Sequence, residues 1–310
     1  MYPHLAAPSF SQHGATFSNQ FTLTISAPVG TIYYTTNGSD PRLEGGGIAP
    51  SAFAYSTPIT LTASRNVRAR AFHTNAWSAL NEATFIEATP IPLRITEFMF
   101  NPFVDETSTN ESEAFEYVEV RNTGSLPLAL AGMKFARGIT FDFPNVVLGP
   151  SQYAVIVKNT AAFQSRYGTG INVLGKYAGS LSDNGENIRL LGALGERIDD
   201  FEYRDWFVLT DGLGFSMTLN TEERDRDSLS EPEAWRVSGV FNGTPGFPDT
   251  PSNMPRIVIN EVLTHTDPPA IDAIELYNPS SAPADIGGWF LTDEARDPMK
   301  FRIPTGTTIG

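Results

Sequence analysis

Residues 93–102 read LRITEFMFNP and residues 115–125 read FEYVEVRNTGS, and the same pattern returns further along the chain. Because self-similarity of this kind marks a repeated structural unit, the sequence predicts one module present twice. The second copy stops at Gly310, so we expect it to be truncated and only marginally stable alone. The corresponding segments are residues 94–97 with 258–261, 118–122 with 274–278, 132–133 with 288–289, and 143–144 with 303–304.

Around this repeat, short alternating runs bounded by turn residues recur, and helical periodicity is nearly absent. Such a pattern favours β-sandwiches. We therefore predict an all-β fold of tandem immunoglobulin-like β-sandwiches, the last one truncated. In the first region Val67, Ala69 and Ala71 should face the core. The expected strands of the middle region are residues 93–98, 115–121, 133–135, 153–158, 188–191 and 197–203.

Three local features of the middle region are predicted from turn and capping chemistry. A short helix is expected over residues 160–167, because Asn159 or Thr160 can cap it and Gly168 can end it. Asn184-Gly185 is interpreted as a tight hairpin turn. Residues 221–233 mix acids with arginines and are predicted to be a solvated excursion, after which Trp235 returns to the core.

These observations divide the chain into six segments. Closely spaced prolines mark the first linker. The segments are an N-terminal extension (1–20), a small β-sandwich (21–88), a linker (89–92), a β-sandwich (93–249), a second linker (250–255) and the partial repeat (256–310).

Composition excludes several classes of function. The formal net charge is −14 and no basic stripe compensates it, so nucleic acid is not an expected partner. Without cysteine there is neither a disulfide nor a thiolate site. No run reaches the length of a membrane helix, and we predict no membrane insertion. The four histidines lack metal-ligand spacing, and no catalytic motif is present, so we predict no enzyme and no catalytic residues.

The segment from Leu93 to Asp249 resembles a bacterial lamin tail domain. The resemblance implies an immunoglobulin-like binding or scaffolding module with no catalytic residues. Residues 256–310 resemble its first half. The motifs that carry the resemblance, besides the two quoted first, are LALAGMKF (128–135), GPSQYAVIVKN (149–159), RYG (166–168), LSDNGENIRLL (181–191) and GTPG (243–246).

The N-terminal region resembles the chitobiase or β-hexosaminidase C-terminal domain, an accessory sandwich found beside catalytic domains. GTIYYTTNGSDPR (30–42), PITLTASRNVRARAF (58–72) and WSAL (77–80) carry this resemblance. The whole order is similar to the C-terminal part of large exported bacterial proteins with a CotH-type kinase domain upstream. It implies an extracellular or cell-surface location, with a signal peptide upstream of this fragment.

One pair of glutamates is the first candidate site. Glu97 has the strand parity of Ile95 and Met99, so its carboxylate needs a partner on an apolar face. We favour a structural hydrogen bond to backbone or an arginine. The alternative is a calcium site shared with Glu119, although Glu119 has the opposite strand parity. Apart from this calcium alternative, no cofactor is expected.

The acidic loop over residues 105–113 is the second candidate, because Asp105 and Glu111 could supply oxygen ligands to calcium. A merely solvated loop is the favoured interpretation. Tyr33, Tyr34, Trp77 and Trp206 could stack on sugars, although at least half of them should be core residues.

These features leave two functions in competition. The leading hypothesis is a non-catalytic adhesion and assembly module that binds protein or polysaccharide at the cell surface. The alternative is a carbohydrate-binding accessory region of an upstream enzyme or kinase-like domain.

Overall fold

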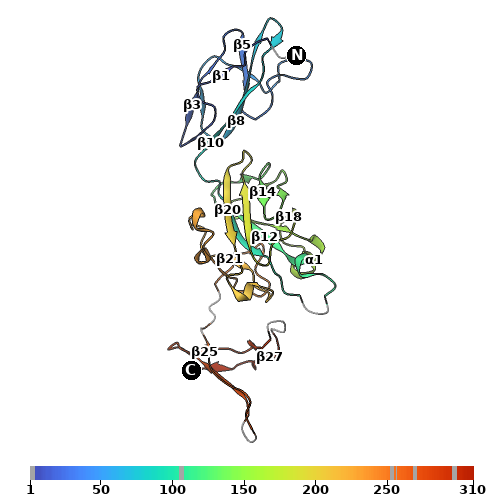
Figure 1. Ribbon diagram of the computed structural model, residues 1–310, viewed down its shortest axis with the longest axis vertical. Coiled ribbons are helices and arrows are strands. Elements are labelled where there is room, and N and C mark those ends of the chain that lie inside the picture. Colours follow the sequence, from blue (N-terminus) through green and yellow to red (C-terminus); the bar gives the residue numbers. More distant parts are fainter. Residues whose placement is uncertain (1–3, 105–107, 252–254, 256, 268–270, 295–298) are drawn as a thin grey trace.

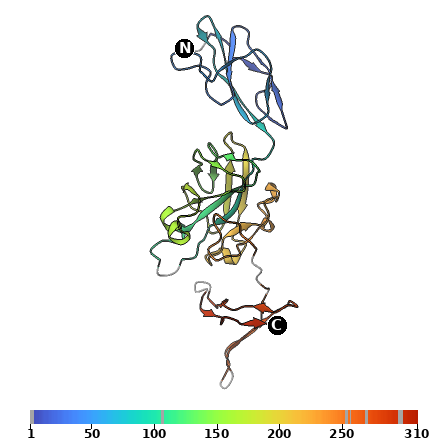
Figure 2. The same cartoon turned by 180° about the vertical axis from the view of Figure 1, so that it is seen from behind.

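A computed structural model describes residues 4–104, 108–251, 255, 257–267, 271–294 and 299–310 of the chain. Three β-rich units follow one another along the longest axis (Figure 1), and the view from behind shows the same order (Figure 2). Within the described ranges there is one α-helix, α1 (Thr160–Tyr167), and no helix is long and apolar enough to cross a membrane. The predicted all-β class is confirmed.

The N-terminal unit is a small sandwich whose largest sheet has the order β2-β10-β8-β5-β6. Val67, Ala69 and Ala71 of β8 face the core, as their alternation predicts. The unit's strands are β1 (Ser9–Phe10), β2 (Ala15–Phe17), β3 (Phe21–Leu23), β4 (Ile25–Ser26), β5 (Thr31–Thr35), β6 (Phe53–Ala54), β7 (Ile59–Leu61), β8 (Arg65–His73), β9 (Ala76–Trp77) and β10 (Asn81–Glu87).

Residues 1–20, expected to be an extension, contribute β1 and β2 to this sandwich. β1 pairs antiparallel with β4. β2 pairs parallel with β10, with Ala15 opposite Phe85 and Phe17 opposite Glu87. Phe17 belongs to the core of the unit, so this first stretch is bound to the sandwich by both hydrogen bonds and apolar packing.

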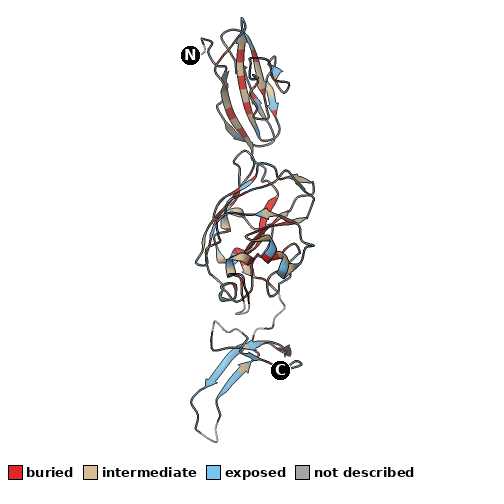
Figure 3. Ribbon diagram, turned by 90° about the vertical axis from the view of Figure 1, so that its right-hand side faces the viewer, coloured by how far each residue is buried: buried red, intermediate tan, exposed pale blue. Residues whose placement is uncertain are grey.

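The middle unit packs a six-stranded sheet, in the order β18-β17-β12-β11-β21-β22, against a four-stranded sheet, in the order β15-β14-β19-β20. All seven residues of β11 are buried, because the sheet is covered on both faces (Figure 3). The strands are β11 (Leu93–Met99), β12 (Tyr117–Asn122), β13 (Leu128–Ala129), β14 (Lys134–Arg137), β15 (Phe141–Asp142), β16 (Val147–Leu148), β17 (Tyr153–Val157), β18 (Val173–Lys176), β19 (Glu186–Leu191), β20 (Arg197–Tyr203), β21 (Met217–Leu219) and β22 (Trp235–Val237).

Helix α1 lies where the sequence predicts it. The side chain of Asn159 accepts hydrogen bonds from the backbone N–H of Ala161 and of Ala162, and Gly168 ends the helix with φ of 79°. Phe163 is buried against Tyr117 on the outer face of the six-stranded sheet. Four short 3-10 helices complete the described elements of this unit, namely η1 (Ser112–Phe115), η2 (Val208–Thr210), η3 (Arg226–Ser228) and η4 (Pro232–Ala234).

The predicted hairpin at Asn184-Gly185 is wrong in its position. The dipeptide does form a turn, with Gly185 at φ of 95°, but the turn leads into β19 from a loop. The hairpin itself joins β19 to β20 through residues 192–196. A Cβ on Gly185 would lie 2.2 Å from the carbonyl oxygen of Tyr203, so close approach to β20 is what requires glycine here.

The described residues of the C-terminal unit form three two-stranded sheets. Val262 and Leu263 of β23, and Ile274 of β24, are exposed, in contrast with the buried β11 and β12 (Figure 3). The strands are β23 (Val258–Leu263), β24 (Ala273–Tyr277), β25 (Ala284–Asp285), β26 (Phe290–Leu291), β27 (Phe301–Arg302) and β28 (Thr308–Ile309).

The repeat seen in the sequence is also a repeat of local structure. Asn122 donates through Nδ2 to the carbonyl of Leu126 at 2.8 Å and accepts from the N–H of Gly124. Asn278 makes the same two bonds, to Ala282 and from Ser280. Each asparagine therefore closes the turn that follows its strand, so the two copies share the turn after β12 and β24.

Candidate functional site

The two candidate glutamates of the middle unit, Glu97 and Glu119, are cross-strand partners on one face of the sheet. The parity argument that separated them is wrong, because the register shifts between Ile95 and Glu97. This β-bulge inserts one residue, so Ile95 points into the main core while Glu97 points to the opposite face. The bulge thus brings two buried carboxylates together.

Glu97 is supplied with hydrogen-bond donors from three parts of the chain. Its Oε1 accepts from the Tyr117 hydroxyl at 2.5 Å, from the Ser216 hydroxyl at 2.5 Å and from the Thr244 N–H at 2.9 Å. Its Oε2 accepts from the Thr244 hydroxyl at 3.2 Å. The GTPG segment is therefore held onto the sheet by this carboxylate, as the structural interpretation of Glu97 expects.

Glu119 has fewer donors. It accepts from the Thr96 hydroxyl at 2.6 Å and from the Gly246 N–H at 2.7 Å. Burial raises the pKa of Glu119 well above its usual range, and the neighbouring Glu97 charge adds to this. Burial also raises the pKa of Glu97, while its Ser216 and Tyr117 bonds oppose the rise. Because two adjacent buried carboxylates resist carrying two charges, we expect Glu119 to hold the proton and Glu97 the charge.

The three calcium candidates within the described residues do not form one cluster. Glu97 and Glu119 line a cavity of about 310 Å³. Glu111 is exposed at the start of η1, and Asp105 lies outside the described residues. No group of three or more His, Cys, Asp or Glu residues suited to a metal ion occurs within the described ranges. Calcium binding stays a prediction without a defined ligand set.

The second copy reproduces the glutamate pair. Glu261 lies opposite Glu275, and the register shifts between Ile259 and Glu261 just as in the first copy. Asn260 donates to Glu275 Oε1 at 3.0 Å, in the place of the Thr96 hydroxyl. The bulge and its two carboxylates are thus a property of the module.

A third buried glutamate, Glu116, was not a candidate from the sequence. Its Oε2 accepts from the Tyr177 hydroxyl at 2.6 Å and from the Leu181 N–H at 3.0 Å, whereas Oε1 has no partner among the described residues. Burial raises the pKa of Glu116 to about 7. The sequence around Glu116 gives no sign of its burial, because its partners Tyr177 and Leu181 lie more than 60 positions along the chain.

Glu116 makes a definite contribution to pH dependence. The pKa of Glu116 in the folded chain lies above its value in the unfolded chain, so the folded chain binds more protons than the unfolded chain in this range. The free energy of unfolding therefore falls as pH rises from about 4.5 to about 7. A shift of this size corresponds to up to about 3 kcal/mol. Glu116→Gln should therefore lessen the decline in melting temperature between pH 5 and pH 8, measured by circular dichroism. An undiminished decline in the variant would contradict this role.

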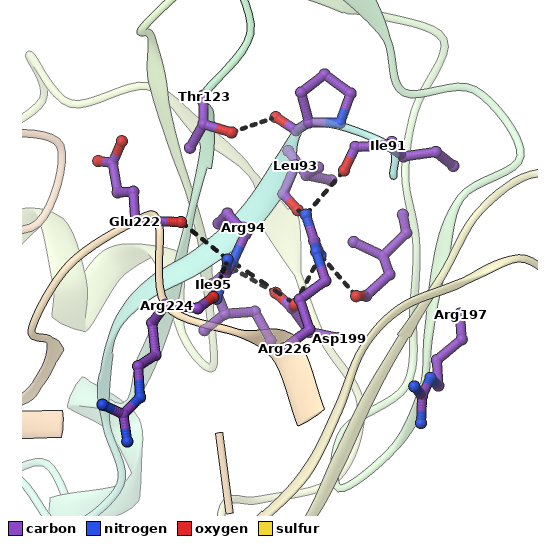
Figure 4. Close-up of polar contacts among 12 residues, drawn as sticks. Ile91, Leu93, Arg94, Ile95, Thr123, Arg197, Asp199, Glu222, Arg224 and Arg226 are labelled. Atoms are coloured by element: carbon purple, nitrogen blue, oxygen red, sulfur yellow. Dashed lines mark hydrogen bonds and ion pairs between the residues drawn. The ribbon is translucent and has the colours of Figure 1, made fainter. Parts of the chain in front are cut away.

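A second polar centre lies where the first linker meets the middle unit (Figure 4). Asp199 of β20 is fully buried and accepts from Arg226 Nη1 at 2.7 Å and from the Ile95 N–H at 3.0 Å. Arg94 Nε lies 3.7 Å from the same carboxylate. Burial raises the pKa of Asp199, and the charges of Arg226 and Arg94 lower it. Two guanidinium groups therefore share one buried carboxylate.

Arg226 connects this centre to the linker. Its Nη2 donates to the carbonyls of Ile91 and Leu93, and its Nη1 also donates to Ile198. The prediction that residues 221–233 are a solvated excursion is wrong for Arg226 and for Leu229, which is fully buried. Alternating charges gave no sign of this, because an arginine can bury its stem and still satisfy its head with backbone carbonyls.

The four aromatic candidates are half-buried. Tyr34 packs against the N-terminal core and Trp206 against the middle core. The Trp77 ring packs 4.7 Å from that of Phe72, and its Nε1 donates to the Gly46 carbonyl. A more exposed aromatic residue, Phe53, was not among the candidates.

The family comparisons agree with the two-copy architecture. The family model of the lamin tail domain matches residues 87–205 and 250–310, which together make up more than half of the chain. The chain belongs to the lamin tail domain family. This lamin tail protein also matches the chitobiase/β-hexosaminidase C-terminal domain over residues 12–80. Both domain types are typically non-catalytic accessory modules, and the matching families include no catalytic domain.

Comparisons with whole proteins add little to the lamin tail assignment. No curated protein matches the chain. One solved structure that is similar is the crystal structure of a DUF4876 family protein from Bacteroides thetaiotaomicron VPI-5482, with 12% sequence identity, coverage of 80% of this chain and 97% of that chain, and a TM-score of 0.34.

Proposed function

We propose that this lamin tail protein is a non-catalytic binding and assembly module, located outside the cell or at its surface as part of a larger multidomain protein. Its partner is protein or polysaccharide. The observation that carries the proposal is the series of accessory modules, one chitobiase-like and two of the lamin tail type. We also propose that the larger protein carries a CotH-type kinase domain upstream of this chain.

The polar groups of the middle unit support a role in binding. The oxygens of Glu97 and Glu119 accept internal hydrogen bonds, and Asp199 is enclosed between Arg94 and Arg226. Such groups hold loops in place instead of facing a substrate. Contacts with a partner would then be made by the outer surfaces of the units.

The test uses the whole 310-residue chain. Purified protein is mixed with bacterial envelope fractions and insoluble polysaccharides, sedimented and quantified. Saturable sedimentation with one fraction, without release of soluble sugar or peptide, is the expected result. Measurable turnover of the bound polymer, or no binding to any fraction, would overturn the proposal.

The second candidate, a carbohydrate-binding accessory region, is favoured by one exposed ring. Phe53 is 59% exposed, and its ring centroid lies 5.8 Å from that of Tyr34, which is in turn 6.2 Å from that of Tyr55. An exposed ring supported by others is a suitable platform for stacking on a sugar face.

Phe53→Ala should weaken binding to any glycan that the wild type recognises on a glycan array. Loss of a central aromatic contact costs more than about 1 kcal/mol, or about fivefold in Kd. Leu126→Ala is the matched control, since Leu126 is also exposed apolar surface but lies in the lamin tail unit. Equal affinities for the two variants would exclude Phe53 from the binding surface.

A further inference from the structure

A cavity of about 510 Å³ lies beside the buried Arg94–Asp199–Arg226 group, between the first linker and the loop before η3. Figure 4 shows several of the surrounding side chains, with Arg94 and Arg226 directed toward Asp199 and Arg224 and Arg197 at either side. The cavity is lined by Pro90, Pro92, Arg94, Thr123, Arg197, Glu222, Arg224, Asp225, Arg226 and Asp227.

Arg94 has unused hydrogen-bonding capacity at this cavity. Only 4% of the Arg94 surface is exposed to solvent. Nη1 donates to the carbonyls of Glu222 and Arg224, at 2.9 and 2.8 Å. Nη2 has no acceptor within the described part of the chain, and Nε has only the 3.7 Å ion pair with Asp199. An unpaired buried guanidinium N–H is costly, so an acceptor supplied from outside would be favourable.

Arg224 is a second arginine with spare donors at the cavity. Its Nε donates to the Ser228 hydroxyl, and no ion pair joins it to a described carboxylate. Two of the three acids that line the cavity already pair with other arginines. Glu222 pairs with Arg121, and Asp227 pairs with Arg197.

The local charge is therefore positive in a chain of net charge −14. Five arginines surround the cavity or pair with its walls, against four carboxylates. The arginines are Arg94, Arg121, Arg197, Arg224 and Arg226, and the carboxylates are Asp199, Glu222, Asp225 and Asp227.

We propose that this cavity is an oxyanion-binding site in which Arg94 and Arg224 hold a carboxylate, sulfate or phosphate group. The planar guanidinium offers paired donors that suit such groups. The site goes beyond the proposed binding function, because it assigns a ligand chemistry and a place for it. Since Pro90 and Pro92 line the cavity, the bound group would also touch the linker between the first two units.

Isothermal titration calorimetry of the full chain with sodium sulfate, against sodium chloride at equal ionic strength, tests the site. Saturable binding of one sulfate is expected, together with a rise in melting temperature. Arg224→Ala should weaken the sulfate Kd at least about tenfold, since it removes charge-assisted hydrogen bonds. Parallel titrations with phosphate and acetate show whether tetrahedral or planar oxyanions bind better.

Arg204→Ala is the matched control, because Arg204 pairs with Glu202 on the surface and does not line the cavity. It should bind sulfate like the wild type. Should Arg224→Ala fail to fold by circular dichroism, Arg224→Gln, which removes the charge and keeps most of the apolar stem, serves instead. No sulfate effect beyond that of chloride, or equal binding by the Arg224 variant and by Arg204→Ala, would overturn the proposal.

Discussion

Replacing Asp199 with alanine should lower the free energy of unfolding of the lamin tail unit by about 3–5 kcal/mol, the usual cost of breaking a buried ion pair. The carboxylate is fully buried and lies between Arg226, at 2.7 Å, and Arg94, at 3.7 Å. Its removal leaves the buried Arg94 and the partly buried Arg226 without a counter-charge, and the Ile95 N–H without an acceptor. Urea denaturation followed by tryptophan fluorescence measures the loss, with Trp235 as the buried reporter of this unit.

The adjacent residue provides the control. Asp200 also carries an ion pair, with Arg189 at 2.9 Å, but both side chains are partly exposed. Asp200→Ala should cost about 1 kcal/mol or less, as partly exposed pairs do. If the two alanine variants proved equally stable, the buried Asp199 would not be the counter-charge that the contacts indicate.

Glu97→Gln should destabilise the lamin tail unit by about 2–3 kcal/mol at pH 7, and Glu119→Gln by less than about 1 kcal/mol. Oε1 of Glu97 accepts three hydrogen bonds, from Tyr117, Ser216 and Thr244, and the neutral amide of glutamine lacks the charge that strengthens them. Glu119 has only two donors, one of which is the Thr96 hydroxyl, which can rotate to accept instead.

The comparison of the two glutamine variants is the decisive measurement, again by urea denaturation. The Glu119 variant also tests a pH dependence. Because burial raises the folded pKa of Glu119, this residue's contribution to stability is greatest at acidic pH and declines as pH rises. Glu119→Gln should remove that decline. A larger loss of stability for Glu119→Gln than for Glu97→Gln would mean that the proton resides on Glu97.

Local chemistry accounts for what the sequence predicted well. Helix α1 was predicted with its observed ends, because Asn159 and Gly168 act within a few residues of themselves. The repeat likewise matched Asn122 with Asn278, and the two side chains close equivalent turns. The face of Glu97 could not be deduced in this way. The bulge before it depends on pairing with β12, and alternation assumes that no residue is inserted.

The polar centre at Asp199 could not be predicted from the sequence, for a different reason. Asp199 and Arg226 are separated by 27 positions, and Arg94 lies more than 100 positions earlier. A charged segment such as residues 221–233 gives no indication of which of its arginines will find a buried carboxylate. Only the packing of the loop against β20 and the linker selects Arg226.

The parallel pairing of β2 with β10 has a mechanical consequence. After the short β1, the chain runs through β2, and it leaves the N-terminal sandwich through β10, toward the linker. If the two ends of this unit are pulled apart, the force runs along both strands in opposite directions, so their hydrogen bonds are sheared together and do not open one after another. Resistance to such a load depends on the rate of unfolding under force, which equilibrium stability does not measure. A tether built in this way would carry tension through the paired strands β2 and β10.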